Sequence, residues 1–285
     1  MRYIGVISGT GKKSLSPVFQ QAALDHLRLD FVYQHWPTPV DGLRDRVKGM
    51  RAPAVAGANV TIPHKQAAVE LMDEVDALVG KVGALNTIVN RDGVLCAYNT
   101  DGAAFVRALR EDGGFEPAGK RVVVAGAGGA ARAVVVALLE ERAASLTVIN
   151  RTAERARRLV HSLRPLSRGT VLDVLPDDAA AWESAVEQAE LLINCTSVGS
   201  AGTAEEKDSP VPVHLIHPQM LVYDLIYRPA ETPLMAAAHE RGARVLGGLP
   251  MLIYQGAASF ELWTEQKAPI DIMFNAAREA LTAEA

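Results

Sequence analysis

The residues whose types and spacing most clearly suggest chemistry lie near the middle of the chain, in the segment Arg121–Arg132. It opens on consecutive valines, an apolar run typical of a buried parallel strand. Gly126, Gly128 and Ala131 follow with the spacing G-x-G-x-x-G/A, and Ala133–Glu141 is long and periodic enough to be a helix. Glycines let the backbone approach a pyrophosphate, and the N–H groups at a helix start face its charge. The segment therefore predicts a dinucleotide site.

The next strand indicates which dinucleotide is bound. It is expected over Ser145–Ile149 and is followed by Asn150, Arg151 and Thr152. Folds that bind NAD usually place an acid near this point to hold the ribose 2′-hydroxyl. An amide and a guanidinium stand here instead, and Arg155 lies one helical turn further, so two arginines could grip a 2′-phosphate. This favours NADP over NAD, although the same arginines are compatible with a solvated helix face.

A nicotinamide enzyme also needs a proton donor or acceptor where the hydride moves. Lys65 ends the run Asn59–Lys65, which leaves a strand-like segment, and Pro63 is expected to fix a turn into a helix over 65–72. Residues at the carboxyl ends of parallel strands face the ligand crevice in such sheets. Lys65 is equally compatible with a surface lysine on the first turn of that helix.

Asp101 and Ser16 are ambiguous in the same way. Asp101 stands at an expected strand-to-helix transition, where aspartate is commonly an N-cap. Ser16 precedes Pro17 and would make a good N-cap with proline at the first helical position. Taken alone, each residue fits a structural role slightly better than a functional one.

Composition limits the class of protein. At 285 residues the chain is long for one domain, and its net charge of −4 without a basic run argues against a nucleic-acid partner. No apolar stretch is long enough for a membrane span, and the N-terminus does not read as a signal peptide. Cys96 and Cys195 are isolated and are expected to be buried thiols, while His214 and His217 lack a third metal ligand nearby. We expect a cytoplasmic protein, monomer or homodimer, with a small-molecule substrate and without a metal.

The elements around these residues predict an α/β fold with two domains. The first is an α/β substrate domain with a mostly parallel sheet, over residues 1–102 plus 249–285. The second is a Rossmann-type NADP domain over residues 103–248, and the C-terminal helices are expected to return to the first domain. The expected strands are 3–8, 31–35, 54–60, a hairpin of 84–90 and 94–98 around Asp92-Gly93, 122–124, 145–149, 191–195, 220–226 and 243–246. The expected helices are 17–27, 42–50, 65–72, 103–111, 133–141, 177–188, 233–241, 251–264 and 270–281.

Taken together, the motifs resemble those of the shikimate dehydrogenase family, and the resemblance covers nearly the whole chain. The motifs occur in this order: Ser14–Pro17, Asn59–Lys65, Gly83–Thr87, Asn99–Gly102, Gly126–Ala133, Asn150–Thr152, Asn194–Ser197, Tyr223–Tyr227, Gly248–Gln255 and Phe260–Trp263. So many motifs in sequence make a chance match very improbable.

The resemblance implies an NADP-dependent oxidoreductase that reversibly reduces 3-dehydroshikimate to shikimate, in aromatic amino-acid and chorismate biosynthesis. It also implies a substrate cleft between the two domains. Lys65 would be the catalytic acid/base, with Asp101 as its partner. Substrate contacts would come from Ser14, Ser16 and Tyr227 at the carboxylate, and from Thr61, Asn86 and Gln255 at the hydroxyls. Cofactor contacts would come from Gly126, Ala127, Gly128, Gly129 and Ala130 at the pyrophosphate, Asn150, Arg151, Thr152 and Arg155 at the adenosine phosphate, and Leu225 and Gly248 at the nicotinamide.

One stretch departs from the family pattern. Before Ser14 the family usually has Gly-x-Pro-Ile-x-His, whereas this chain has Ser8–Lys13 with two added lysines. The change leaves open a shift in substrate preference. A quinate/shikimate dehydrogenase with broader substrate or NAD use is therefore one alternative, and a non-catalytic dinucleotide-binding sensor is another.

Overall fold

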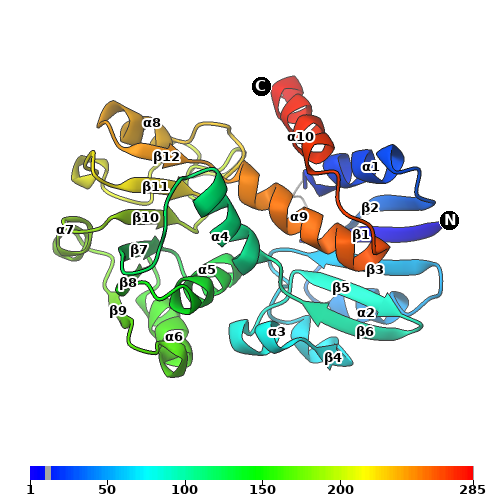
Figure 1. The fold of residues 1–285 in the computed structure, drawn as a ribbon. Coiled ribbons are helices and arrows are strands. Elements are labelled where there is room, and N and C mark those ends of the chain that lie inside the picture. Colours follow the sequence, from blue (N-terminus) through cyan, green and yellow to red (C-terminus); the bar gives the residue numbers. More distant parts are fainter. Residues whose placement is uncertain (10–13, 285) are drawn as a thin grey trace. The chain divides into compact units, whose positions relative to one another are not determined.

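The computed structural model describes residues 1–9 and 14–284 (Figure 1). The departure at Ser8–Lys13 therefore lies outside the described residues from position 10 onward. The chain divides into two compact units, one of residues 1–104 and 253–285 and the other of residues 105–252. The expected division into a substrate domain and an NADP domain, with boundaries at residues 102 and 249, stays a prediction.

The first unit is built on a six-stranded sheet in the order β2-β1-β3-β5-β6-β4. All neighbouring strands are parallel except at β5, which pairs antiparallel with β3 and with β6. The expected hairpin is present, and positive φ angles at Asp92 and Gly93 suit its two-residue turn. The strands are β1 (Arg2–Ser8), β2 (Phe31–Pro37), β3 (Val55–Val60), β4 (Glu74–Val75), β5 (Thr87–Arg91) and β6 (Val94–Tyr98).

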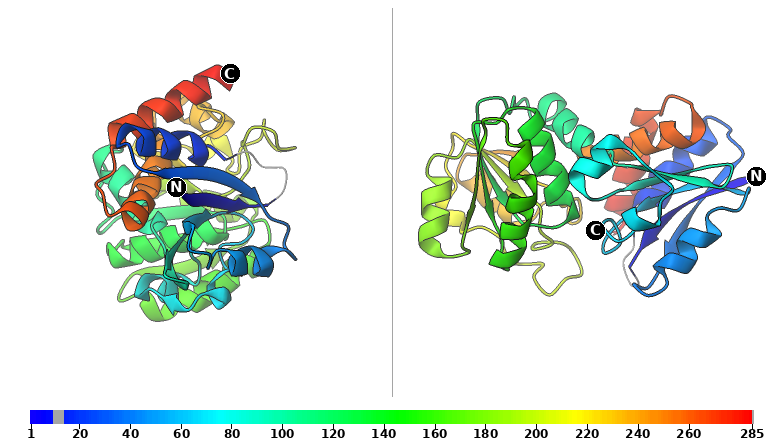
Figure 2. Two further views of the ribbon diagram at one scale, coloured as in Figure 1. Left: turned by 90° about the vertical axis from the view of Figure 1, so that its right-hand side faces the viewer. Right: turned by 90° about the horizontal axis from the view of Figure 1, so that it is seen from below.

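The C-terminal helices return to this unit, which confirms that expectation. The last helix packs beside the first one along the chain, as both views of Figure 2 show. The helices of this unit are α1 (Ser16–His26), α2 (Leu43–Gly49), α3 (Ala77–Val82), α10 (Ile270–Glu284) and the short 3₁₀ turn Val69–Leu71. Two further helices, α4 (Asp101–Glu111) and α9 (Leu249–Thr264), run across the division between the units.

The second unit is a doubly wound parallel sheet in the order β12-β11-β10-β7-β8-β9. The order reverses between β7 and β10, which is where such sheets bind dinucleotides. The strands are β7 (Arg121–Ala125), β8 (Ser145–Ile149), β9 (Val171–Leu175), β10 (Leu191–Asn194), β11 (Leu221–Asp224) and β12 (Arg244–Leu246). The helices are α5 (Gly129–Glu140), α6 (Ala153–Leu163), α7 (Ala179–Val186) and α8 (Pro233–Glu240), with 3₁₀ turns at Arg164–Leu166 and Val213–Leu215.

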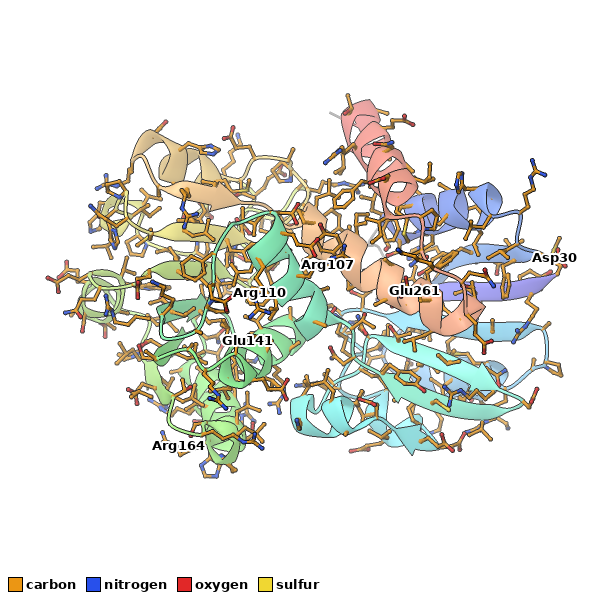
Figure 3. All side chains as sticks on the ribbon, viewed as in Figure 1. Asp30, Arg107, Arg110, Glu141, Arg164 and Glu261 are labelled. Atoms are coloured by element: carbon orange, nitrogen blue, oxygen red, sulfur yellow. The ribbon has the colours of Figure 1, made fainter. Side chains whose placement is uncertain are left out.

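Alternate residues along the strands bury the two faces of this sheet. Val123 and Val222 pack with α7 and α8 on one face. On the other face, Phe105 of α4 stacks on Tyr223 with ring centroids 5.2 Å apart. At the surface, Arg110 of α4 bridges Glu116 and Glu141, which follows α5 (Figure 3). Both faces are thus covered by helices, as a parallel sheet requires.

Some local expectations were wrong. Residues 65–72 form turns and one short 3₁₀ segment in place of the expected helix. Three short elements, β4, α3 and β9, were not anticipated. Cys96 is buried as expected, whereas Cys195 keeps intermediate exposure. None of the helices in residues 1–9 and 14–284 combines the length and apolar character of a membrane span.

Candidate active site and dinucleotide site

One edge of the first-unit sheet collects the polar motifs. β1 and β3 are parallel neighbours, so Ser14 and Lys65, which follow them, emerge at the same edge. β5 runs antiparallel to β3, and therefore Asn86, which precedes β5, also lies there. β6 ends at this edge too and leads into Asp101. Sheet topology thus brings together side chains that are distant in sequence.

Lys65 and Asp101 form a direct ion pair at this edge. The Lys65 Nζ atom lies 2.6 Å from Oδ2 of Asp101, and the two side chains are 15% and 5% exposed. Charges this far withdrawn from water persist when they are paired and further hydrogen-bonded. The structure therefore places the two residues expected to take part in proton transfer in direct contact.

Lys65 is held by a turn and not by a helix, which corrects the expected local structure. Its backbone carbonyl accepts a hydrogen bond from the Leu85 N–H at 2.9 Å. The preceding His64 is buried, and its Nε2 atom donates to the Thr38 carbonyl at 2.8 Å. These tertiary bonds outweigh the weak helical preference of the sequence. Lys65 is thereby anchored on both sides.

Asp101 is the first residue of α4, yet its carboxylate does not cap the helix. The side chain of Asn99 accepts the Asp101 N–H at 3.0 Å, a role expected of an N-terminal capping residue. The Asp101 carboxylate instead receives Lys65 on one oxygen and the Asn86 side-chain amide on the other, at 2.9 Å. The expectation that the Asp101 side chain caps the helix is therefore wrong, and its functional role stays a prediction.

Asn86 connects this pair to the end of the chain. Its Nδ2 atom lies 3.1 Å from Gln255 Oε1 on α9 and 2.8 Å from the Thr100 hydroxyl. Its Oδ1 atom accepts the Thr100 N–H at 2.9 Å. The structure therefore brings Lys65, Asp101, Asn86 and Gln255 into one cluster of hydrogen bonds.

Ser14, Ser16 and Thr61 lie in segments that leave the same sheet edge. The expectation that Ser16 caps α1 was wrong: Leu15 occupies the N-cap position, and the Ser16 N–H donates to Ser14 Oγ at 3.2 Å. The Ser16 side chain is buried, and the pKa of Tyr33 is raised by burial, against an opposing effect of Ser16. Thr61 follows β3 directly and is half-buried. No direct bond between Lys65 and these three residues is present among the described contacts.

The glycine loop of the second unit fits a pyrophosphate. Gly126 has φ +115°, in the region that favours glycine, and a Cβ there would lie 3.1 Å from the Cys195 carbonyl carbon. At Gly128 a Cβ would meet nothing within 4 Å, and none of the described side chains caps α5 at this residue. The backbone N–H groups of Gly129 and Ala130 at the helix start suit an anion. Ala127 lies between the two glycines.

The residues expected at the adenosine phosphate follow β8. Asn150 donates to the Thr152 carbonyl at 2.9 Å, and Thr152 is the N-cap of α6. Arg155 is exposed on the first turn of that helix. Arg151 is 78% exposed and forms an ion pair with Glu205 from the loop before β11. Arg151, which is expected to bind the 2′-phosphate, is therefore paired with a carboxylate of the chain itself.

Leu225 and Gly248 lie against each other. A Cβ at Gly248 would fall 2.1 Å from the Leu225 carbonyl oxygen, so only glycine fits there. Tyr227 is half-buried two residues later in the same loop and belongs to the second unit, whereas Ser14 and Ser16 belong to the first. A joint role of these three at a carboxylate stays a prediction. Within the described residues, no His, Cys, Asp or Glu cluster is arranged to hold a metal ion.

Comparisons with known proteins show the family to which the chain belongs. The family model of the shikimate dehydrogenase substrate binding domain matches residues 6–88, and that of shikimate / quinate 5-dehydrogenase matches residues 110–218. The model of the shikimate 5′-dehydrogenase C-terminal domain matches residues 248–278. The shikimate dehydrogenase (NADP(+)) of Moorella thermoacetica is 44% identical over 270 residues, which cover 95% of this chain and 90% of that protein. The chain belongs to the shikimate dehydrogenase family.

Solved structures agree with this membership and with the α/β, two-sheet fold class. Shikimate 5-dehydrogenase of Thermus thermophilus, in complex with NADP(H) and shikimate, has a TM-score of 0.87 at 36% identity, covering 99% of this chain and 100% of that one. Quinate dehydrogenase of Corynebacterium glutamicum, in complex with NAD, has a TM-score of 0.87 at 27% identity, covering 98% and 99%. The expectations of family and fold are confirmed.

Several polar residues of the first-unit cluster were not among the expected site residues. Asn59, Thr87 and Thr100 are buried and hydrogen-bonded to or next to Asn86. Their signal in the sequence is their position: each is directly adjacent to, or two residues from, a residue that was singled out. Buried polar side chains need partners, and such partners lie near other polar groups.

Proposed function

We propose that this chain catalyses the reversible, NADPH-dependent reduction of 3-dehydroshikimate to shikimate. The observation that carries the proposal is the buried Lys65–Asp101 ion pair, with Asn86 and Gln255 bonded beside it. Lys65 and Asn86 lie within residues 6–88, which the family substrate-binding model matches. A small polyhydroxylated acid suits a lining of hydroxyl, amide and charged groups, because a ligand that leaves such a buried group unpaired binds less well.

In the proposed reaction, bound NADPH would supply the hydride that the carbonyl carbon takes up and would thereby become NADP⁺. The electron pair of the carbonyl π bond moves to its oxygen, and the Lys65 ammonium donates a proton to that oxygen. Asp101 holds the ammonium in place and balances its charge. In the reverse direction the Lys65 amine takes the proton from the shikimate hydroxyl, so one residue serves both directions.

The remaining roles are those that the family resemblance implies. Ser14, Ser16 and Tyr227 would hold the substrate carboxylate, and Thr61, Asn86 and Gln255 its hydroxyls. The loop Gly126–Ala130 would hold the pyrophosphate through backbone N–H groups. Asn150, Arg151, Thr152 and Arg155 would hold the 2′-phosphate, with Leu225 and Gly248 beside the nicotinamide. The family and the pathway make the cytoplasm the proposed location.

The test is an initial-rate assay of four pairings: shikimate or quinate, each with NADP⁺ or NAD⁺. We expect the highest kcat/KM for shikimate with NADP⁺. A higher value for quinate or for NAD⁺ would replace the proposal with a quinate/shikimate dehydrogenase of broader use. NADPH binding without turnover of either substrate would identify a dinucleotide sensor.

A further inference from the structure

A chain of buried polar groups leads from helix α9 toward the Lys65–Asp101 pair. Ser259 on α9 and Thr87 at the start of β5 have no solvent exposure (0% each). Their hydroxyl oxygens are 2.7 Å apart. The Thr87 hydroxyl lies 3.0 Å from Asn86 Oδ1 and donates to it. Groups buried this deeply are costly unless bonded, so their hydrogen bonds fix their geometry.

The direction of these hydrogen bonds follows from counting hydrogens. Thr87 has one hydroxyl hydrogen, and Asn86 Oδ1 can only accept, so Thr87 donates to Asn86 and must accept from Ser259. The Ser259 hydroxyl also donates to the Gln255 carbonyl at 2.9 Å and lies 3.4 Å from the Thr100 hydroxyl, so its one hydrogen is shared between Thr87 and these neighbours. Thr87 is thus one of the acceptors to which Ser259 can give this hydrogen.

Asn59 and Tyr33 orient the start of this chain. The Tyr33 hydroxyl donates to Asn59 Oδ1 at 2.8 Å, which turns the Asn59 Nδ2 group toward Ser259, 3.0 Å away. Asn59 thus donates to Ser259, and when Ser259 donates to Thr87 the hydrogens of the series Asn59–Ser259–Thr87 point toward Asn86. Hydrogen bonds arranged in series polarise one another, so the last donor is strengthened.

The consequence is a fixed orientation of the Asn86 amide. Its Oδ1 atom accepts from the Thr87 hydroxyl at 3.0 Å and from the Thr100 N–H at 2.9 Å. Its Nδ2 atom therefore faces Asp101 Oδ1 at 2.9 Å. In the opposite orientation the amide oxygen would face the carboxylate, which is repulsive. The carboxylate would then lose a donor on the side away from Lys65.

We propose that Thr87 and Ser259 are positioning residues for the reaction, acting in series to lock the Asn86 amide against Asp101 and so to hold that carboxylate on Lys65. The inference rests on the proposed function, because it concerns the residues assigned there to proton transfer. Thr87 and Ser259 act through Asn86, because the Thr87 hydroxyl donates to its Oδ1 atom and the Ser259 hydroxyl bonds that of Thr87.

The test compares variants that separate the hydroxyl from the methyl group of Thr87. Thr87→Val keeps the shape and removes the hydroxyl, and we expect kcat for shikimate oxidation to fall roughly three- to tenfold, with a smaller change in KM. Thr87→Ser keeps the hydroxyl and should stay within about twofold of wild type. Thr170→Val is the matched control, because this buried threonine of the second unit donates only to the Ala143 carbonyl. We expect it to leave kcat unchanged.

A second comparison tests action in series. Ser259→Ala should lower kcat in the same direction, and the double variant with Thr87→Val should be no slower than Thr87→Val alone. Effects that multiply would overturn the serial arrangement. Wild-type kcat in Thr87→Val, or a loss in Thr87→Ser as large as that in Thr87→Val, would overturn the positioning role. Should Thr87→Val fail to fold, Ser259→Ala carries the test, and full activity there overturns the proposal.

A measurement without turnover separates this inference from the proposed function. The side-chain amide of Asn86 can be followed by NMR hydrogen exchange. We expect exchange at least about tenfold faster in Thr87→Val than in wild type and in Thr170→Val, because one anchor of the amide is lost. Equal exchange rates would overturn the positioning role of Thr87. If the wild-type protein turns over neither substrate, only the proposed function fails. The exchange rates still show whether Thr87 holds the Asn86 amide in place.

Discussion

Lys65 and Asp101 are 36 residues apart in sequence, yet the Lys65 Nζ and Asp101 Oδ2 atoms lie 2.6 Å from each other. Asn86 donates to the second Asp101 oxygen, so both carboxylate oxygens are engaged. Removing one partner of a pair so withdrawn from water leaves the other charge uncompensated. The two residues therefore form one unit, and a change to either is expected to disturb both.

The first prediction concerns the proton. Lys65→Ala should lower kcat for shikimate oxidation by roughly 10²- to 10⁴-fold, because the variant lacks the amine that takes the proton in the proposed reaction. KM for shikimate should change by less than about threefold, since the polar lining remains. Steady-state rates with saturating NADP⁺ measure both quantities. Lys48→Ala, at an exposed position of α2, is the control and should behave as wild type. Near-normal kcat in Lys65→Ala would refute the assigned role.

The residue types of this site could be predicted from the sequence, but part of their local structure could not. The positions of Lys65 and Asp101 after expected strands left their roles open, and the resemblance to the family singled them out as a pair. The expected helix after Lys65 did not form, because the Lys65 carbonyl pairs with the Leu85 N–H and His64 is drawn into the core. Contacts between residues distant in sequence determine the structure of this segment, and such contacts cannot be predicted from local periodicity.

Most strands of the second unit were easier to predict, since they are rich in branched apolar residues, whereas β9, which contains Asp173, was missed. The expected strand at Ser145–Ile149 is found with those bounds. The pairing of Arg151 with Glu205 was not foreseen, because the two residues are 54 positions apart and the loop that carries Glu205 has no regular pattern. Likewise, nothing in the spacing of Ser259 reveals that its hydroxyl meets Thr87. Side-chain partners across a fold depend on packing and not on local sequence.

The second prediction concerns cofactor choice. A 2′-phosphate that binds Arg151 must displace or repel the Glu205 carboxylate, which now holds that guanidinium. Glu205→Gln should therefore lower KM for NADP⁺ about two- to fivefold, the range expected for one exposed ion pair. KM for NAD⁺, which has no phosphate there, should not fall.

The matched control for this variant is Glu206→Gln, which removes the same charge one residue later. Glu206 accepts the Gly202 N–H and does not pair with Arg151 among the described contacts. An equal gain for NADP⁺ in both variants would point to net charge alone. Rates should be compared at one fixed ionic strength, because surface electrostatics are screened by salt.

The third prediction contrasts two glycines of the second unit. Gly248→Ala would place a Cβ 2.1 Å from the Leu225 carbonyl oxygen, so the backbone must shift, at a cost of roughly 1–3 kcal/mol. Gly128→Ala meets nothing within 4 Å in the fold and should leave the Tm nearly unchanged. It should nevertheless weaken NADPH binding about tenfold or more, since its Cβ would stand where the pyrophosphate approaches. Thermal unfolding and NADPH titration by fluorescence measure the two effects. Tight NADPH binding by Gly128→Ala would contradict the proposal that the glycine loop binds the pyrophosphate.

The last prediction concerns Asp224, a carboxyl at the end of β11 with no solvent exposure (0%). Burial raises its pKa from the ordinary 3.8 to about 6, against the opposing effect of hydrogen bonds from Ile226, Thr232 and Asn194. A carboxyl with a raised pKa in the folded state favours folding in its protonated form. Its contribution is therefore full below about pH 4 and is lost as the pH rises to about 6.

Asp224→Asn tests this directly, because the amide imitates the protonated carboxyl: Oδ1 still accepts from Asn194 and Ile226, and Nδ2 can donate to the Thr232 hydroxyl. The free energy of unfolding of wild type minus that of the variant should fall by roughly 2–3 kcal/mol between pH 4 and pH 6.5, and then level off. Urea denaturation at a series of pH values, followed by a probe in the second unit, measures this difference. Taking the difference cancels the carboxyls that both proteins share. A difference that stays constant across this range, or that grows with pH, would show that Asp224 is ionised throughout.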